Sequence, residues 1–99
     1  MNHNPKFLAR VDHARRTICE CSVDEFIQLR NEDKSFRLID VREESEFAAG
    51  HIPGAIHLSK GVIERDIESA ISELNEHLVL YCGGGYRSAI AAESLVAMG

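Results

Sequence analysis

Residues 78–99, LVLYCGGGYRSAIAAESLVAMG, contain the pattern that decides the fold of this chain. The apolar run Leu78–Tyr81 predicts a buried strand, which stops at Cys82 and is followed by three glycines. Apolar residues at helical spacing then predict a helix that opens near Arg87. The apolar side of this helix is formed by Ala89, Ile90, Ala92, Leu95 and Val96. The segment is therefore predicted to be a strand, a tight loop and a helix, with a thiol where the strand ends.

The position of Cys82 favours the thiolate form of its side chain. The first turn of a helix leaves backbone N–H groups unpaired and carries the positive end of the helix dipole. Gly83, Gly84 and Gly85 tolerate positive φ, so they can turn more N–H groups toward one point, and Arg87 adds a fixed cation. Thiolate is the reactive form of cysteine. Cys82 is therefore predicted to be a nucleophile, although a free cysteine is often only a small buried residue.

Two motifs resemble a known family. Residues 82–87, CGGGYR, fit the C-x-x-G-x-R active-site loop of single-domain rhodaneses, sulfurtransferases that carry sulfane sulfur as a cysteine persulfide. Residues 38–58, LIDVREESEFAAGHIPGAIHL, are similar to the second signature of that family. The resemblance covers about residues 17–99 and implies a rhodanese-like α/β fold. Residues 1–16 then form an N-terminal amphipathic helical extension.

The resemblance implies roles for particular residues. Cys82 and Arg87 are the expected catalytic residues, and Asp40 and Arg42 are candidates for positions behind the site. The expected substrate-binding residues are Gly83, Gly84, Gly85, Tyr86 and Ser88. The Cys82 thiolate would attack the sulfane sulfur of a donor such as thiosulfate or a persulfide. A thiol or cyanide would then remove the outer sulfur, and a protein thiol is a further candidate acceptor. The chemistry requires no metal and no organic cofactor.

Two other classes of function stay open. Rhodanese-like folds include phosphatases and arsenate reductases, in which five residues separate the cysteine from the arginine, whereas residues 83–86 supply four. The smaller loop suits one sulfur atom better than a tetrahedral oxyanion. Noncatalytic sulfur-carrier or regulatory modules are the second class, but regulatory modules generally lose the cysteine that this chain has.

Composition limits the partners. The net charge is −5, from 11 basic and 16 acidic residues, which argues against nucleic-acid binding. No apolar run is long enough for a signal peptide or a membrane span. Three cysteines without an even pairing suggest a reducing, cytoplasmic setting, and the spacing of Cys19 and Cys21 fits no common zinc or redox motif. The arginines at positions 10, 15 and 16 are interpreted as a solvated helix face.

The rest of the chain alternates helices and strands, which predicts a parallel sheet with helices on both faces. Helices are expected at residues 6–16, 23–30, 43–49 and 61–76, and strands at 17–21, 36–41 and 55–58. The first helix presents Phe7, Leu8, Val11 and Ala14 on one side. The helix at 61–76 presents Ile63, Ile67, Ala70, Ile71 and Leu74.

Four finer predictions concern single residues. Ser22 and Glu25 should form a capping box, and Gly50 should end its helix in the left-handed conformation. Arg42 and Glu46 can pair at helical spacing. His51 and His57 are expected to be structural.

The last prediction concerns the sheet. A crossover helix normally returns the chain to another parallel strand, and the chain stops at Gly99 after such a helix. We therefore expect a C-terminally incomplete sheet, with an open edge or a partner chain beside Leu78–Tyr81.

Overall fold

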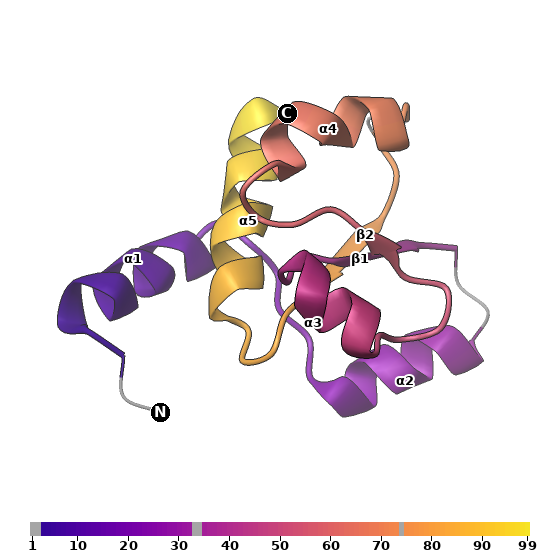
Figure 1. Ribbon diagram of the computed structural model, residues 1–99, viewed down its shortest axis with the longest axis horizontal. Helices are drawn as coiled ribbons and strands as arrows, with labels where there is room; N and C mark the ends of the chain where they lie inside the picture. The colour runs from indigo at the N-terminus through magenta and orange to yellow at the C-terminus, as the bar shows by residue number, and fades with distance from the viewer. Residues whose placement is uncertain (1–2, 33–34, 74) are drawn as a thin grey trace.

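The computed structural model describes residues 3–32, 35–73 and 75–99 of the chain (Figure 1). Five helices and three strands occur in these residues. In chain order they are α1 (Pro5–Arg15), α2 (Val23–Asn31), β1 (Arg37–Asp40), α3 (Glu44–Ala49), β2 (Ile56–His57), α4 (Ile63–Ala70), β3 (Leu78–Tyr81) and α5 (Tyr86–Met98). The predicted α/β class is confirmed.

The strands form a parallel sheet in the order β2-β1-β3. Ile39 of β1 lies opposite Ile56 of β2 on one side and Leu80 of β3 on the other. The connection through α3 and the connection through α4 cross the sheet in opposite directions. Because such crossovers are right-handed, they place their helices on opposite faces. The predicted two-sided arrangement follows, and Figure 1 shows α2 and α5 on opposite sides of the strands.

The core lies between β1 and the pair of helices α4 and α5. Its buried members are Ile39, Val41, Ile63, Ile67, Ile71 and Ala91. Burying an isoleucine or valine side chain contributes about 1.5–3 kcal/mol. Residues 38–41 are all buried, as expected of a parallel strand covered on both faces. This burial holds the carboxyl end of β1 beside the end of β3, where Cys82 follows.

The structure corrects the expected strand at residues 17–21. This segment is irregular and joins no sheet, and Cys19 and Cys21 are both exposed. Its alternation of residue types is short, and a strand is stable only when a neighbouring strand accepts its backbone hydrogen bonds. The segment instead runs from the end of α1 to the capping box of α2, where Glu25 N donates to Ser22 Oγ as predicted.

Two helix ends also differ from expectation. The helix expected at residues 61–76 ends at Ala70, because Ile71 adopts extended backbone while its side chain stays in the core. Ala70 is exposed, and Leu74 lies outside the described residues. Gly50 follows α3 with φ 159 and ψ 141, which is not the left-handed helical conformation that we expected.

α1 packs along α5. Val11 and Ala14 are fully buried there, and Arg10 forms an ion pair with Glu93 of α5 at 2.6 Å. Leu8, expected on the packed side, is 36% exposed. α5 also differs from expectation, because Val96 is 58% exposed and Ala91 is buried in its place. Contact with α1 on one side and with the core on the other gives α5 two packed sides.

β3 forms one edge of the sheet, and no strand within the described residues pairs with its outer side. The predicted open edge beside Leu78–Tyr81 is therefore present. The incompleteness of the sheet stays a prediction. In the described part of the chain, no helix is long and apolar enough to cross a membrane.

Candidate functional site

Cys82 lies between the end of β3 and the start of α5, partly buried. Its Sγ accepts a hydrogen bond from Gly85 N at 3.1 Å and a longer one from Ser88 N at 3.5 Å. The Ser88 hydroxyl lies 3.6 Å from the same sulfur. Gly85 caps α5 with φ 85 and ψ −6, a left-handed conformation that glycine adopts at little cost. The loop therefore directs its N–H groups onto the sulfur.

These contacts favour the thiolate. Burial by itself would raise the pKa of Cys82, but hydrogen bonds from the Ser88 side chain and from the backbone of Ser88, Gly84 and Gly85 outweigh it. The pKa of the thiol is therefore lowered from its usual value. The sequence predicted this direction from the helix start and the glycines, and the structure adds the Ser88 hydroxyl.

Arg87 is held by Glu46 of α3. Its Nη1 lies 2.8 Å from Glu46 Oε2, and its Nη2 lies 3.1 Å from Glu46 Oε1. The same carboxylate accepts a hydrogen bond from Glu43 N at the start of α3, at 2.9 Å. The Arg87 hydrogen bonds, followed by the Glu43 bond, lower the pKa of Glu46 to about 2.

Arg87 also faces Cys82. The pKa of Arg87 is raised first by Glu46, and the charge of the Cys82 sulfur adds to that effect. The cation is therefore paired with the Glu46 carboxylate and is close enough to Cys82 to interact with its charge. The expected pair of Arg42 and Glu46 does not form, and Glu46 was not predicted as a site residue.

Arg42 instead pairs with Asp40, which is fully buried. Arg42 Nη2 lies 2.7 Å from Asp40 Oδ2, and the Tyr81 hydroxyl donates to the same oxygen at 2.8 Å. Arg42 Nη2 also donates to Gly50 O at 2.7 Å, and Tyr81 Oη accepts from Ile52 N at 3.1 Å. Burying the Asp40 carboxylate without a partner would cost free energy, so Asp40 pairs with the nearest guanidinium, that of Arg42.

This network ties the loop after α3 to the ends of β1 and β3. Tyr81 immediately precedes Cys82, but within the described residues no hydrogen bond links the network to the sulfur. Asp40 and Arg42 thus support the carboxyl end of the sheet, and their place behind the site stays a prediction. The sequence predicts Tyr81 only as a strand residue.

The histidines form a separate stack on Phe47. The ring centroids of His51 and Phe47 are 3.7 Å apart, and those of His57 and Phe47 are 4.7 Å apart, with nearly parallel planes. Two rings on one face at these distances would overlap, so Phe47 lies between them. Each imidazole also bonds a backbone carbonyl, of Phe47 and Arg42 respectively. These contacts agree with structural roles.

Three side chains cover the glycines of the loop. A Cβ at Gly83 would lie 3.6 Å from Arg87 Nη2, and one at Gly84 would lie 3.4 Å from the Tyr86 ring. A Cβ at Gly85 would lie 3.8 Å from Nη2 of Arg15, which comes from α1. The sequence is interpreted as placing Arg15 on a solvated helix face; the side chain is partly exposed and also contacts the loop. No local sequence signal connects α1 with this loop.

No group of three or more His, Cys, Asp and Glu side chains in the described residues is arranged to hold a metal ion. The site contains a thiol with a lowered pKa, backbone donors aimed at it and a neighbouring cation. Such a site can perform nucleophilic chemistry at sulfur.

Comparisons with known proteins agree with this geometry. Residues 22–99 match the family model described as "Rhodanese-like domain". The chain is 36% identical over 85 residues to the Bacillus subtilis protein YrkF, named as a candidate sulfur carrier, covering 84% of this chain and 44% of that protein. It is 33% identical over 78 residues to the thiosulfate sulfurtransferase GlpE of Shewanella oneidensis, covering 79% of this chain and 74% of that one.

A solved structure matches over the whole length of this chain. It is a protein of unknown function from Rhodopseudomonas palustris, described as a possible tyrosine phosphatase, with 27% identity and a TM-score of 0.85. The match covers 100% of this chain and 83% of that one. The chain spans about half the length, 44% to 55%, of the first three curated relatives that it matches. By the family match over residues 22–99, this chain belongs to the rhodanese-like domain family.

Proposed function

We propose that this protein is a sulfurtransferase that carries sulfane sulfur as a persulfide on Cys82. The observation that carries the proposal is the pair of backbone hydrogen bonds from Gly85 and Ser88 to Cys82 Sγ, in a loop that also lowers the thiol pKa. Similarity to a thiosulfate sulfurtransferase over 79% of the chain supports it.

The proposed reaction has two steps. The Cys82 thiolate attacks the outer sulfur of thiosulfate, the S–S bond of the donor breaks, and sulfite leaves with the electron pair. The product is a Cys82 persulfide anion, which the loop N–H groups and Arg87 stabilise. An acceptor thiolate or cyanide then attacks the outer sulfur, which leaves as a new persulfide or as thiocyanate. The Cys82 thiolate is regenerated.

Donors and acceptors belong to the same proposal. Thiosulfate and low-molecular-weight persulfides are the proposed donors. Small thiols, cyanide and a protein thiol are the proposed acceptors. Because Cys19, Cys21 and Cys82 are all free thiols, we propose the reducing cytoplasm as the compartment.

A phosphatase or arsenate reductase is the second candidate, favoured by the description of the Rhodopseudomonas palustris structure. Two features argue against it. Four residues separate Cys82 from Arg87, one fewer than in the rhodanese-fold phosphatases. Gly85 N and Ser88 N are directed at the sulfur itself.

A single-turnover experiment separates the candidates. The reduced protein is mixed with thiosulfate and examined by mass spectrometry, with sulfite measured in parallel. We expect one added sulfur atom on the peptide that contains Cys82, one equivalent of sulfite, and loss of the added sulfur as thiocyanate after cyanide. An aryl phosphate and arsenate serve as rival substrates. Turnover of either one, with no sulfur on Cys82 from thiosulfate or a small-molecule persulfide, would overturn the proposal.

A further inference from the structure

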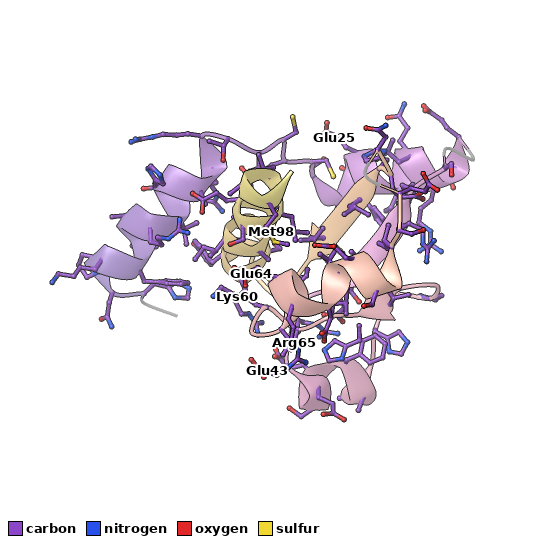
Figure 2. The ribbon with its side chains drawn as sticks, turned by 90° about the horizontal axis from the view of Figure 1, so that it is seen from above. Glu25, Glu43, Lys60, Glu64, Arg65 and Met98 are labelled. Atoms are coloured by element: carbon purple, nitrogen blue, oxygen red, sulfur yellow. The ribbon has the colours of Figure 1, made fainter. Side chains whose placement is uncertain are left out.

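α1 and the residues just before it bring three side chains to the Cys82 loop, where they contact Tyr86 and Gly85. The His3 ring, just before α1, lies 4.5 Å from the Tyr86 ring, and the Phe7 ring lies 6.0 Å from it. The Arg15 guanidinium carbon lies 5.3 Å from the centre of the same ring. Figure 2 looks along α5 from the end where Met98 is labelled and shows α1 on the side of α5 away from the strands. Residues 3–15 precede the segment that matches the family model.

Arg15 reaches past Tyr86 to the loop itself. Its Nη2 lies 3.8 Å from the position that a Cβ on Gly85 would occupy. Gly85 is the residue whose N–H bonds Cys82 Sγ at 3.1 Å. A second guanidinium, that of Arg87, lies close to Gly83 at the other end of the glycine loop.

The guanidinium groups of Arg15 and Arg87 differ in the N–H donors that remain free to bind a ligand. Arg87 uses both Nη atoms to hold Glu46. Arg15 donates only its Nε, to Glu20 Oε1 at 3.0 Å, and within the described residues its Nη atoms have no hydrogen-bond partner. The Arg15 side chain is 35% exposed, so solvent and solutes reach it. A planar guanidinium with open Nη donors is well suited to bind carboxylate, sulfonate or sulfite oxygens.

We propose that Arg15 binds the anionic oxygens of the sulfur donor at the mouth of the Cys82 loop, so that α1 gives the site its preference for anionic substrates. The Tyr86 ring, contacted by His3 and Phe7, supports the guanidinium from one side. In thiosulfate the oxygens lie beyond the sulfur that Cys82 attacks, so their partner must lie at the mouth of the loop. The proposal rests on the proposed function for the identity of the donor, but anion binding can be measured without sulfur transfer.

The test uses two alkylating reagents that differ in charge. Cys19 and Cys21 are replaced by serine so that Cys82 is the single thiol. The rate constants of Cys82 with iodoacetate, an anion, and with neutral iodoacetamide are then measured at one pH, and their ratio reports anion attraction. For Arg15→Ala we expect the ratio to fall about three- to tenfold, while the iodoacetamide rate changes less than about twofold.

Arg16→Ala is the matched control, because Arg16 is the next residue, is exposed and carries the same charge. Its ratio should stay within about twofold of the parent value. Arg15→Lys should recover part of the ratio through its charge. Glu20→Gln should raise the ratio, because it removes the negative charge that partly neutralises Arg15. Arg15→Gln, which keeps the length of the side chain, replaces Arg15→Ala if circular dichroism shows that the alanine variant is unfolded.

The same variants are then compared with thiosulfate. Arg15→Ala should raise KM about three- to tenfold and change kcat less. An alkylation ratio in Arg15→Ala and Arg15→Gln equal to that of Arg16→Ala would overturn the proposal. If Arg15→Ala lowers the ratio but the parent protein transfers no sulfur from any donor, the anion site is supported and the sulfurtransferase function is rejected. The two proposals therefore fail in distinguishable ways.

Discussion

Arg87 of α5 and Glu46 of α3 form a bidentate ion pair at 2.8 and 3.1 Å, although they are 41 positions apart in the chain. The pair connects the helix that starts at the thiol loop with the helix that follows β1. It keeps the Arg87 guanidinium beside Cys82 in a fixed orientation and partly neutralises it. The electrostatic effect of Arg87 on the thiol is therefore set jointly with Glu46.

Replacing Arg87 should weaken the thiolate. Arg87→Ala removes the cation that faces the sulfur, so the pKa of Cys82 should rise and donor use should fall. Arg87→Lys should restore the charge but not the bidentate pair, and its effect should be intermediate. Iodoacetamide labelling of Cys82 as a function of pH measures the pKa. An unchanged labelling profile in Arg87→Ala would leave the loop N–H groups and Ser88 as the whole cause of the lowered pKa.

The pKa of the Glu46 carboxylate should show whether the ion pair with Arg87 forms. Its pKa is about 2 because it accepts hydrogen bonds from Arg87 and from Glu43 N. The pair should therefore stabilise the fold above the ordinary glutamate pKa of about 4.3 and lose this effect as the pH falls through about 2. In Arg87→Ala the pKa of Glu46 should move up toward its ordinary value. An NMR titration of the side-chain carboxyl tests this, with Glu44 of the same helix as an internal reference; an unmoved Glu46 would contradict the pairing in solution.

Cys82→Ser should abolish sulfur transfer without unfolding the domain. A serine hydroxyl has a far higher pKa and cannot carry sulfane sulfur. Cys19→Ser and Cys21→Ser are the controls and should keep the activity, since both side chains are exposed outside the loop. Thiocyanate formation measures activity, and circular dichroism checks the fold. Loss of activity in either control would mean that a second thiol takes part.

The Asp40 network should affect stability more than reactivity. Asp40→Asn leaves Arg42 without its buried anion and should cost about 2–4 kcal/mol of unfolding free energy. Tyr81→Phe removes one donor to Asp40 and the partner of Ile52 N, and should cost about 1–3 kcal/mol. Urea unfolding measures both. The iodoacetamide rate of Cys82 should change less than about twofold; a tenfold change would place the network in the site itself.

The network should also make stability depend on pH. Burial favours the neutral form of Asp40, but hydrogen bonds from Arg42 and Tyr81 outweigh it and the pKa is lowered. The stabilisation should therefore be present above the ordinary aspartate pKa of about 3.9 and be lost as the pH falls through the lowered value. Asp40→Asn should remove that part of the acid dependence.

The sequence by itself determined the features that depend on neighbours along the chain. The strand, glycine loop and helix around Cys82 follow from burial patterns and glycine chemistry over about twenty residues. The capping box of Ser22 and Glu25 likewise joins residues three apart. The buried run of β1 was equally visible as an apolar pattern. Short-range rules of this kind are readable because the partners are fixed by the spacing.

Only the tertiary structure decided which charges meet. Arg42 and Glu46 have the spacing of a helical pair. In the structure, however, Arg42 pairs with the buried Asp40, and Glu46 pairs with Arg87. The pairing follows from the cost of burying the Asp40 carboxylate, and its burial depends on packing by elements far apart in the chain. Packing of α1 on α5 likewise carried Arg15 to the thiol loop, and residues 17–21, with no strand beside them to pair with, stayed irregular.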